Sequence, residues 1–251
     1  MVEHDGETWV FAELYDRVLR RGVIGCCQLT EHGASSWKIV LNMPYHLSYP
    51  HIMQGEDAFY MIPESYVANE IGVFKAVEFP YKWEKCAVLK NDFCAVDSTV
   101  FELDGKKWML TLRFCEGHEE LTLFSLDEKG SVGGTVVAAD DLNKRPAGKP
   151  FTQDGKLIRP AQDCTESYGC ALNFYEVTEV SENRYEERLV RKIRPEEIRS
   201  DLKNTPAGLH TYNMSDSYEV VDLKEYELDW LFYIMRPIWF VWRRVRKVFG
   251  R

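Results

Sequence analysis

The sequence predicts an all-β fold, a five-bladed β-propeller with a C-terminal amphipathic helix. Hairpin-turn dipeptides recur along the chain at a nearly constant interval, and each is followed by several short apolar segments. No convincing helical period occurs before residue 225. Four short strands in a period of about 50 residues are typical of propeller blades, whereas a β-sandwich would not repeat its turns so regularly.

Asp-Gly pairs define the repeat. Asp5–Gly6, Asp104–Gly105 and Asp154–Gly155 each precede an apolar segment, and Gly55 begins a related Gly-Glu-Asp turn, so the four glycines lie 49, 50 and 50 residues apart. The strands expected directly after the turns are 8–13, 59–64, 107–112 and 157–162, and those expected next are 22–29, 70–77, 120–126 and 171–177. Further strands are expected at 37–41 and 83–89, at 49–53, 97–101, 145–151 and 209–213, and in a partial fifth unit at 215–221.

Two regions follow from this pattern: a propeller over residues 1–224 and a basic amphipathic helix over 225–251. The chain begins almost at its first turn, so we expect the strand before Asp5 to be truncated. Either another segment then closes the ring, or the natural chain starts upstream.

Composition excludes several classes of function. A net charge of −9 and a pI near 5.3 argue against a nucleic-acid partner, because binding to phosphates requires a concentrated basic surface. Seven cysteines without zinc-type spacing predict reduced thiols, and we expect neither a metal nor a cofactor. The N-terminus lacks a signal-peptide pattern, so we expect a cytoplasmic protein, or one peripheral to the inner face of a membrane.

The strands nearest the propeller axis line a central channel, and the residues that recur on them are candidates for a site. Seven residues beyond the turn positions 6, 57, 105 and 155 lie Glu13, Glu64, Leu112 and Gln162. Asp97 aligns with Tyr49 one repeat earlier, and His51 and His210 lie near the same level. Asp97, Glu64 and Asp163 are the candidate catalytic acids, because cleavage of a glycosidic bond requires paired carboxyl groups. The alternative is that these acids accept structural hydrogen bonds.

The densest cluster of polar residues runs from Arg145 to Tyr168 and contains two Arg-Pro pairs. Arg145 and Arg159 carry guanidinium groups suited to carboxylate or phosphate, and with Glu13, His51, Gln162, Tyr168 and His210 they form the expected substrate-binding set. Two alternatives remain open at this point. The arginines can pair with aspartates to join neighbouring blades, and His210 can be a hydrogen-bonded wall residue.

These motifs resemble a known family. The segments 49–52, 62–65, 79–83, 97–101, 145–148, 159–164 and 208–213 resemble the N-terminal domain of glucosamine inositolphosphorylceramide transferases, a five-bladed propeller related to glycoside hydrolase family 43. The resemblance covers residues 4–222, and Arg-Pro-Ala-Gln-Asp-Cys at 159–164 is its most specific element. It implies that Asp97 matches the second inner acid of the family-43 hydrolases, while Glu64 and Asp163 both remain candidates for the proton donor. The resemblance also implies that in the plant-type transferases transfer resides in a separate C-terminal domain, which we do not expect within this sequence.

The last residues have a different character. From Trp230 to Trp242 nearly every position is apolar, and Arg243, Arg244, Arg246 and Lys247 follow. The apolar stretch is too short for a membrane-spanning helix, so we expect an interfacial helix that contacts an anionic membrane or a membrane-bound glycosyltransferase. The alternative is a helix docked on protein.

Two functions are compatible with these observations. One is a carbohydrate-active enzyme of the hydrolase or transglycosidase type. The other is a non-catalytic glycan-binding or scaffold propeller that serves a membrane-bound glycosyltransferase. The distance between carboxyl groups in the channel would separate them.

Overall fold

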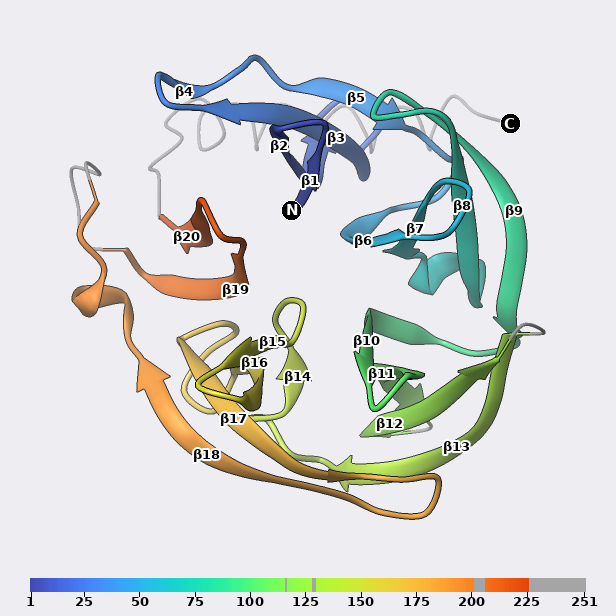
Figure 1. The fold of residues 1–251 in the computed structure, drawn as a ribbon, viewed down its shortest axis with the longest axis vertical. Helices are drawn as coiled ribbons and strands as arrows, with labels where there is room; N and C mark the ends of the chain where they lie inside the picture. The colour runs from blue at the N-terminus through green and yellow to red at the C-terminus, as the bar shows by residue number, and fades with distance from the viewer. Residues whose placement is uncertain (116, 128–129, 201–205, 226–251) are drawn as a thin grey trace, which may run out of the picture.

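The computed structural model describes residues 1–115, 117–127, 130–200 and 206–225. Its strands form antiparallel sheets arranged around a common centre, as Figure 1 shows, which confirms the prediction of an all-β propeller. The amphipathic helix expected at 225–251 falls, from residue 226 onward, outside the described residues. Among those residues, no helix is long and apolar enough to cross a membrane.

Four sheets contain four or five strands each. The first sheet contains β1 (Val2–His4), β2 (Glu7–Asp16), β3 (Arg21–Thr30), β4 (Gly33–Ala34) and β5 (Lys38–Leu41). The second contains β6 (Ser48–Gln54), β7 (Phe59–Glu64), β8 (Glu70–Glu78) and β9 (Lys82–Asn91). The third contains β10 (Ala95–Leu103), β11 (Lys106–Cys115), β12 (His118–Asp127) and β13 (Gly130–Ala139). The fourth contains β14 (Arg145–Pro146), β15 (Phe151–Gln153), β16 (Lys156–Asp163), β17 (Ala171–Val180) and β18 (Tyr185–Ile193).

The fifth position around the centre is occupied by a two-stranded sheet. It consists of β19 (Gly208–Met214) and β20 (Glu219–Lys224), and it lies between the fourth and first sheets (Figure 1). Two short 3₁₀ helices complete the described elements, η1 (Tyr66–Ala68) and η2 (Pro195–Glu197).

One predicted strand is divided in the structure. The segment 145–151 separates into β14 and β15, both of which pair with β16. Pro146 and Pro150 flank the break, and proline cannot donate a ladder hydrogen bond. Gly148, between them, has a φ of +138°, outside the range of an extended L-residue.

Apolar side chains fill the spaces between neighbouring sheets rather than one central core. Trp9 and Phe11 of the first sheet pack with Met61, Phe74 and Trp83 of the second. Similar clusters join the second sheet to the third, the third to the fourth, and the fourth to β19 and β20. The hydrophobic effect therefore holds the sheets side by side and leaves the polar ends of the inner strands to form the centre.

Gly148 provides a test of how closely the fourth sheet approaches β19. A Cβ on Gly148 would lie 1.8 Å from the Tyr212 carbonyl oxygen, whereas one on Gly155 (φ +74°) would meet nothing within 4 Å. We expect Gly155→Ala to cost about 1 kcal/mol through backbone strain alone. Gly148→Ala should cost clearly more, about 3 kcal/mol, because the backbone must also move. Urea unfolding of both variants measures this, and equal losses would show that the two backbones do not meet there.

Candidate functional site

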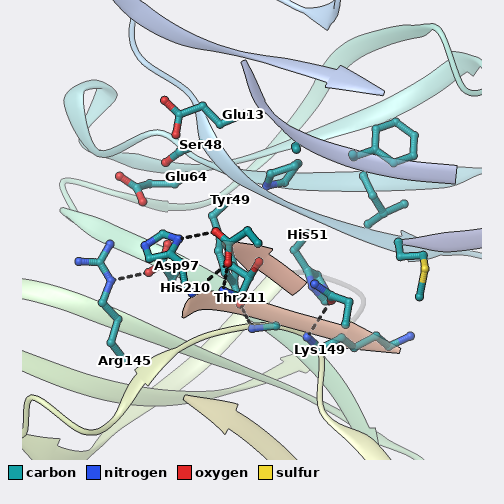
Figure 2. A pocket seen from close by; sticks show the side chains of 18 of the residues that line it. Glu13, Ser48, Tyr49, His51, Glu64, Asp97, Arg145, Lys149, His210 and Thr211 are labelled. Atoms are coloured by element: carbon teal, nitrogen blue, oxygen red, sulfur yellow. Dashed lines mark hydrogen bonds and ion pairs between the residues drawn. The ribbon is translucent and has the colours of Figure 1, made fainter. Parts of the chain in front are cut away.

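A polar pocket of about 450 Å³ lies where the inner strands of the sheets meet. Figure 2 shows its walls, with Glu13, Ser48 and Glu64 on one side and His51 and Lys149 on another. The polar side chains that line it are those of Glu13, His46, Ser48, Tyr49, His51, Glu64, Asp97, Arg145, Lys149, Tyr168, His210, Thr211, Asn213 and Asp222.

β-Bulges on the inner strands turn side chains into this pocket. The register of β6 against β7 shifts between Ser48 and His51, and that of β10 against β11 shifts between Val96 and Thr99. The residues at these shifts, Tyr49 and Asp97, have φ values of +41° and +53°. The structure thus confirms that the two positions are equivalent. A left-handed conformation is unusual for a bulky residue such as tyrosine, and bulges of this kind often re-aim a side chain beside a functional site.

Asp97 is the anchored acid of the pocket. The Arg145 Nε donates a hydrogen bond to Asp97 Oδ2 at 2.5 Å, and Gln162 Nε2 donates to the same oxygen at 3.1 Å. Gln162 also donates to the Pro146 carbonyl oxygen at 3.0 Å. Gln162 therefore holds Asp97 in place through its hydrogen bond to Oδ2, although Gln162 itself is not among the residues that line the pocket.

Glu64 is a carboxyl group that keeps its proton at neutral pH. Burial raises the pKa of Glu64 to about 8, and the negative charge of Asp97 adds to the effect. Arg145 and Ser48 offset only part of the shift. At pH 7 the protonated Glu64 can therefore act as a hydrogen-bond donor.

A histidine network forms the opposite side of the pocket. His210 Nδ1 lies 3.2 Å from Asp222 Oδ2, and its Nε2 is hydrogen-bonded to the Tyr168 hydroxyl. The Arg145 guanidinium lies over the Tyr168 ring, 5.2 Å from its centre. These contacts connect the fourth sheet to β19 and β20 across the pocket.

Glu13 faces a second histidine. The Gly22 amide donates to His46 Nδ1 at 2.8 Å, so the proton of a neutral His46 resides on Nε2, which lies 3.6 Å from Glu13 Oε1. Burial raises the pKa of Glu13, while His46 and His210 act in the opposite direction.

His51 is neutral. The Val100 amide donates to His51 Nε2 at 3.1 Å, and burial, followed by the charge of Lys149, lowers the pKa of His51 to about 3. The adjacent Tyr49 hydroxyl bonds with the Thr99 hydroxyl at 2.8 Å and accepts from the Gly148 amide at 2.6 Å. These residues form the buried floor rather than an acid or base.

Besides Gln162, two further expected site residues, Arg159 and Asp163, lie outside the pocket, so the prediction that these three residues line it is wrong. Arg159 turns toward β18, where its Nε and Nη2 each lie 2.7 Å from a carboxylate oxygen of Glu187. Asp163 pairs with Lys192 and accepts from the Thr165 amide at 2.9 Å. Burial alone would raise the pKa of Asp163, but Lys192 and Thr165 outweigh it and lower the pKa to about 2. Both side chains are buried charges already neutralised by partners on or beside the same sheet.

Seven of the ten predicted residues therefore meet in one pocket, namely Glu13, His51, Glu64, Asp97, Arg145, Tyr168 and His210. Sequence reasoning missed His46, Lys149 and Asp222 as pocket residues. His46 and Lys149 follow no repeat position. Asp222 lies in the partial fifth unit, where the turn pattern is weakest. Among the described residues, no group of three or more His, Cys, Asp or Glu side chains could hold a metal ion.

Comparison with known proteins gives both a family and a fold. The family model described as glucosamine inositolphosphorylceramide transferase 1, N-terminal, matches residues 1–216. The chain is 30% identical over 196 residues to glucosamine inositolphosphorylceramide transferase 1 of Oryza sativa subsp. japonica, and 26% identical over 200 residues to that of Arabidopsis thaliana. Each match covers 72% of this chain but only 26% and 25% of the relatives, so the chain spans about a quarter of their length.

The similar solved structures are propellers of glycoside hydrolases. An α-L-arabinofuranosidase from Lactobacillus brevis aligns with a TM-score of 0.62 at 11% identity, covering 89% of this chain and 83% of that one. An α-L-arabinofuranosidase from Clostridium thermocellum aligns with a TM-score of 0.58 at 13% identity, covering 88% and 79%. A family-43 β-1,3-galactosidase aligns with a TM-score of 0.61 at 13% identity, covering 86% and 49%. At these identities the likeness establishes the fold alone.

The pairing of Arg159 with Glu187 predicts an acid-sensitive contribution to stability. Both side chains are almost fully buried, and Arg159 lowers the pKa of Glu187 to about 2. Glu187→Gln should lower the free energy of unfolding by about 3–5 kcal/mol at pH 7, since it leaves the guanidinium unpaired. The difference in free energy of unfolding between the native chain and Glu187→Gln should be complete above the unfolded pKa of glutamate, about 4.3. It should disappear as the pH falls through about 2.

Chemical denaturation between pH 7 and pH 2 measures this difference, with Glu176→Gln as the matched control. Glu176 pairs with the exposed Arg188, so Glu176→Gln should lower the free energy of unfolding much less than Glu187→Gln does. If the difference in free energy of unfolding between the native chain and Glu187→Gln stayed constant as the pH fell, Glu187 would not form the ion pair with Arg159 that we infer.

Proposed function

Because this chain belongs to the family of glucosamine inositolphosphorylceramide transferase N-terminal domains, we propose that its central pocket binds a sugar of a glycan, with Glu64 as the proton donor. The observation that carries the proposal is that Glu64 lines the same pocket as Asp97 and Arg145 and is buried there, which raises its pKa to about 8. A carboxyl group that stays protonated at pH 7 can donate to a sugar oxygen. Carboxylates, a guanidinium and the Tyr168 ring supply the other contacts that a hydroxyl-rich ligand needs.

In the catalytic form of this proposal, Glu64 protonates the leaving oxygen of a glycosidic bond. The second working carboxylate must stand about 5–5.5 Å away for retention or about 6.5–9.5 Å for inversion. Asp97 is bound by Arg145 and Gln162, and its negative charge helps to keep the proton on Glu64. Glu13, which lines the same pocket beside His46, then activates the water or attacks the sugar.

The second candidate is a glycan-binding propeller without catalysis. Existing partners favour it: Asp97 is bound by Arg145 and Gln162, and His210 by Asp222 and Tyr168, so the pocket is already organised without a ligand. The relatives carry the name glucosamine inositolphosphorylceramide transferase 1, and this chain spans about a quarter of their length. In this form it presents a glycan to a membrane-bound glycosyltransferase.

The proposal extends to the β19–β20 sheet and to the location of the protein. We treat the β19–β20 sheet as a reduced fifth blade, since it takes the fifth place around the centre. The sequence 230–251, rich in tryptophan and arginine, supports a cytoplasmic protein held at the inner face of a membrane.

Glu64→Gln separates the two forms. Glutamine is close in shape to the protonated carboxyl group and still donates, so sugar binding should stay within about twofold, while turnover should fall at least about a hundredfold. Isothermal titration and product analysis with arabinohexaose, β-1,3-galactotriose and a glucosamine-bearing inositolphosphoryl headgroup would measure both. Binding by the native chain should also weaken as the pH rises through about 8, when Glu64 ionises. Unchanged turnover in Glu64→Gln would remove Glu64 from the chemistry.

Asp97→Asn tests the acid that maintains this proton. The change keeps the volume but removes the charge, so the pKa of Glu64 should fall and sugar binding or turnover should be lost without unfolding. The loss should be present at pH 7 and smaller at pH 5, where Glu64 is protonated again. The melting temperature serves as control. Native binding and activity at a native melting temperature would show that Asp97 is needed for neither sugar binding nor chemistry.

A further inference from the structure

Three loops of the first two sheets adjoin, along the chain, residues that line the pocket. They are the hairpin tip between β2 and β3 (residues 16–21), the connection between β5 and β6 (42–47), and the connection between β7 and β8 (65–69). Each lies within a few residues of a side chain that lines the pocket: Glu13 precedes the first, His46 belongs to the second, and Glu64 precedes the third. We call the surface formed by 16–21, 42–46 and 65–69 the apolar rim.

The hairpin tip is an ordered turn that displays apolar side chains. Asp16 Oδ1 accepts hydrogen bonds from the amides of Val18 and Leu19, each at 2.8 Å, and the Arg20 amide donates to the Asp16 carbonyl oxygen at 2.7 Å. Val18 is nevertheless 91% exposed and Leu19 45% exposed. Hairpin tips usually carry polar residues, so two exposed aliphatic side chains held in a fixed turn indicate a contact surface.

The other two loops continue this surface. The Arg21 guanidinium donates to Asn42 Oδ1 at 3.0 Å and to the Pro44 carbonyl oxygen at 3.4 Å, which joins the tip to the second loop. Tyr45 packs against the apolar cluster that joins the first two sheets. On η1, Tyr66 and Val67 are 44% and 66% exposed. The apolar rim therefore runs across both sheets beside the pocket.

Basic and acidic residues are unevenly distributed over the loops at this end of the propeller. The apolar rim contains three arginines and a single carboxylate, Asp16, in a chain of net charge −9. The corresponding connections of the third and fourth sheets (92–94, 140–144 and 164–170) instead carry Asp92, Asp140, Asp141 and Glu166, with Lys144 paired to Glu187.

We propose that the apolar rim docks on an anionic lipid bilayer, so that the pocket mouth opens toward the lipid headgroups. Exposed aliphatic and tyrosine side chains beside arginines match the boundary between acyl chains and anionic headgroups, while the acidic side of the same end is repelled. The course of the chain agrees with this orientation. Lys224, the last residue of β20, donates to the Tyr168 carbonyl oxygen at 3.4 Å, so the chain passes the pocket mouth just before the tryptophan- and arginine-rich sequence 230–251. This inference goes beyond sugar binding and does not depend on which sugar is bound.

The experiment measures partition of the full chain onto vesicles of phosphatidylcholine with and without phosphatidylserine. Val18→Ser with Leu19→Ser should lower the partition coefficient on the anionic vesicles about tenfold, because two aliphatic side chains no longer enter the interface. Arg17→Gln should lower it about fivefold and Arg17→Lys should not, since one basic charge near the surface is lost only in the first. Leu189→Ser with Val190→Ser is the matched control on β18, where the two side chains are 54% and 47% exposed, and it should bind as the native chain does.

Further variants separate the rim from other sources of binding. A chain that carries Arg243→Gln and Arg244→Gln tests the contribution of the terminal sequence. Val18→Ser with Leu19→Ser should still lower the partition coefficient of that chain on anionic vesicles, which would show that the rim binds in addition to the terminal sequence. Asp97→Asn should leave vesicle binding unchanged, which distinguishes failure of this inference from failure of the sugar-binding proposal. The inference is overturned if the native chain does not prefer anionic vesicles. It is also overturned if the chain with the serine pair on the rim binds anionic vesicles as well as the native chain does. The same holds if the β18 control loses as much vesicle binding as the rim variant. In either case the rim would be left for a protein partner.

Discussion

The hydrogen-bonded ion pair between Asp97 and Arg145 organises the centre of this propeller. Asp97 comes from the third sheet and Arg145 from the fourth, while Glu64 reaches the pair from the second. A propeller packs its apolar side chains between its sheets, so the centre has little apolar packing and must be held by polar contacts. Since buried charges are expensive without partners, the pair determines how its neighbours can be charged.

The charge state of Glu64 follows from this arrangement. Burial raises the pKa of Glu64 to about 8, and the negative charge of Asp97 adds to this effect, while Arg145 offsets part of it. Glu64 therefore stays protonated at neutral pH although a guanidinium lies in the same cluster. A carboxyl group that keeps its proton at neutral pH is suited to donate that proton.

The same end of the molecule combines a polar pocket with an asymmetric surface. The loops that follow Glu13 and Glu64 carry exposed apolar side chains, and the first of them also carries arginines, while the loops around the third and fourth sheets carry carboxylates. Because both pocket and loops belong to the ends of the same strands, the orientation of the surface also sets the direction from which a ligand enters. A glycan attached to a lipid would then approach the pocket without leaving the membrane. That relation connects the proposed sugar site with the family to which the chain belongs.

The sequence by itself determined the repeat, its turns, and the equivalence of Asp97 with Tyr49 and of Glu13 with Glu64, because turn chemistry and strand alternation act over a few residues. It could not determine which charged residues face the pocket. Arg159 and Asp163 stand in the most specific motif of the chain, yet Glu187 and Lys192 hold them away from the centre. Conversely, His46 and Asp222 join the site although no repeat position marks them. The partner of a buried charge comes from a strand distant in sequence, so only the tertiary structure decided which of these side chains became part of the site.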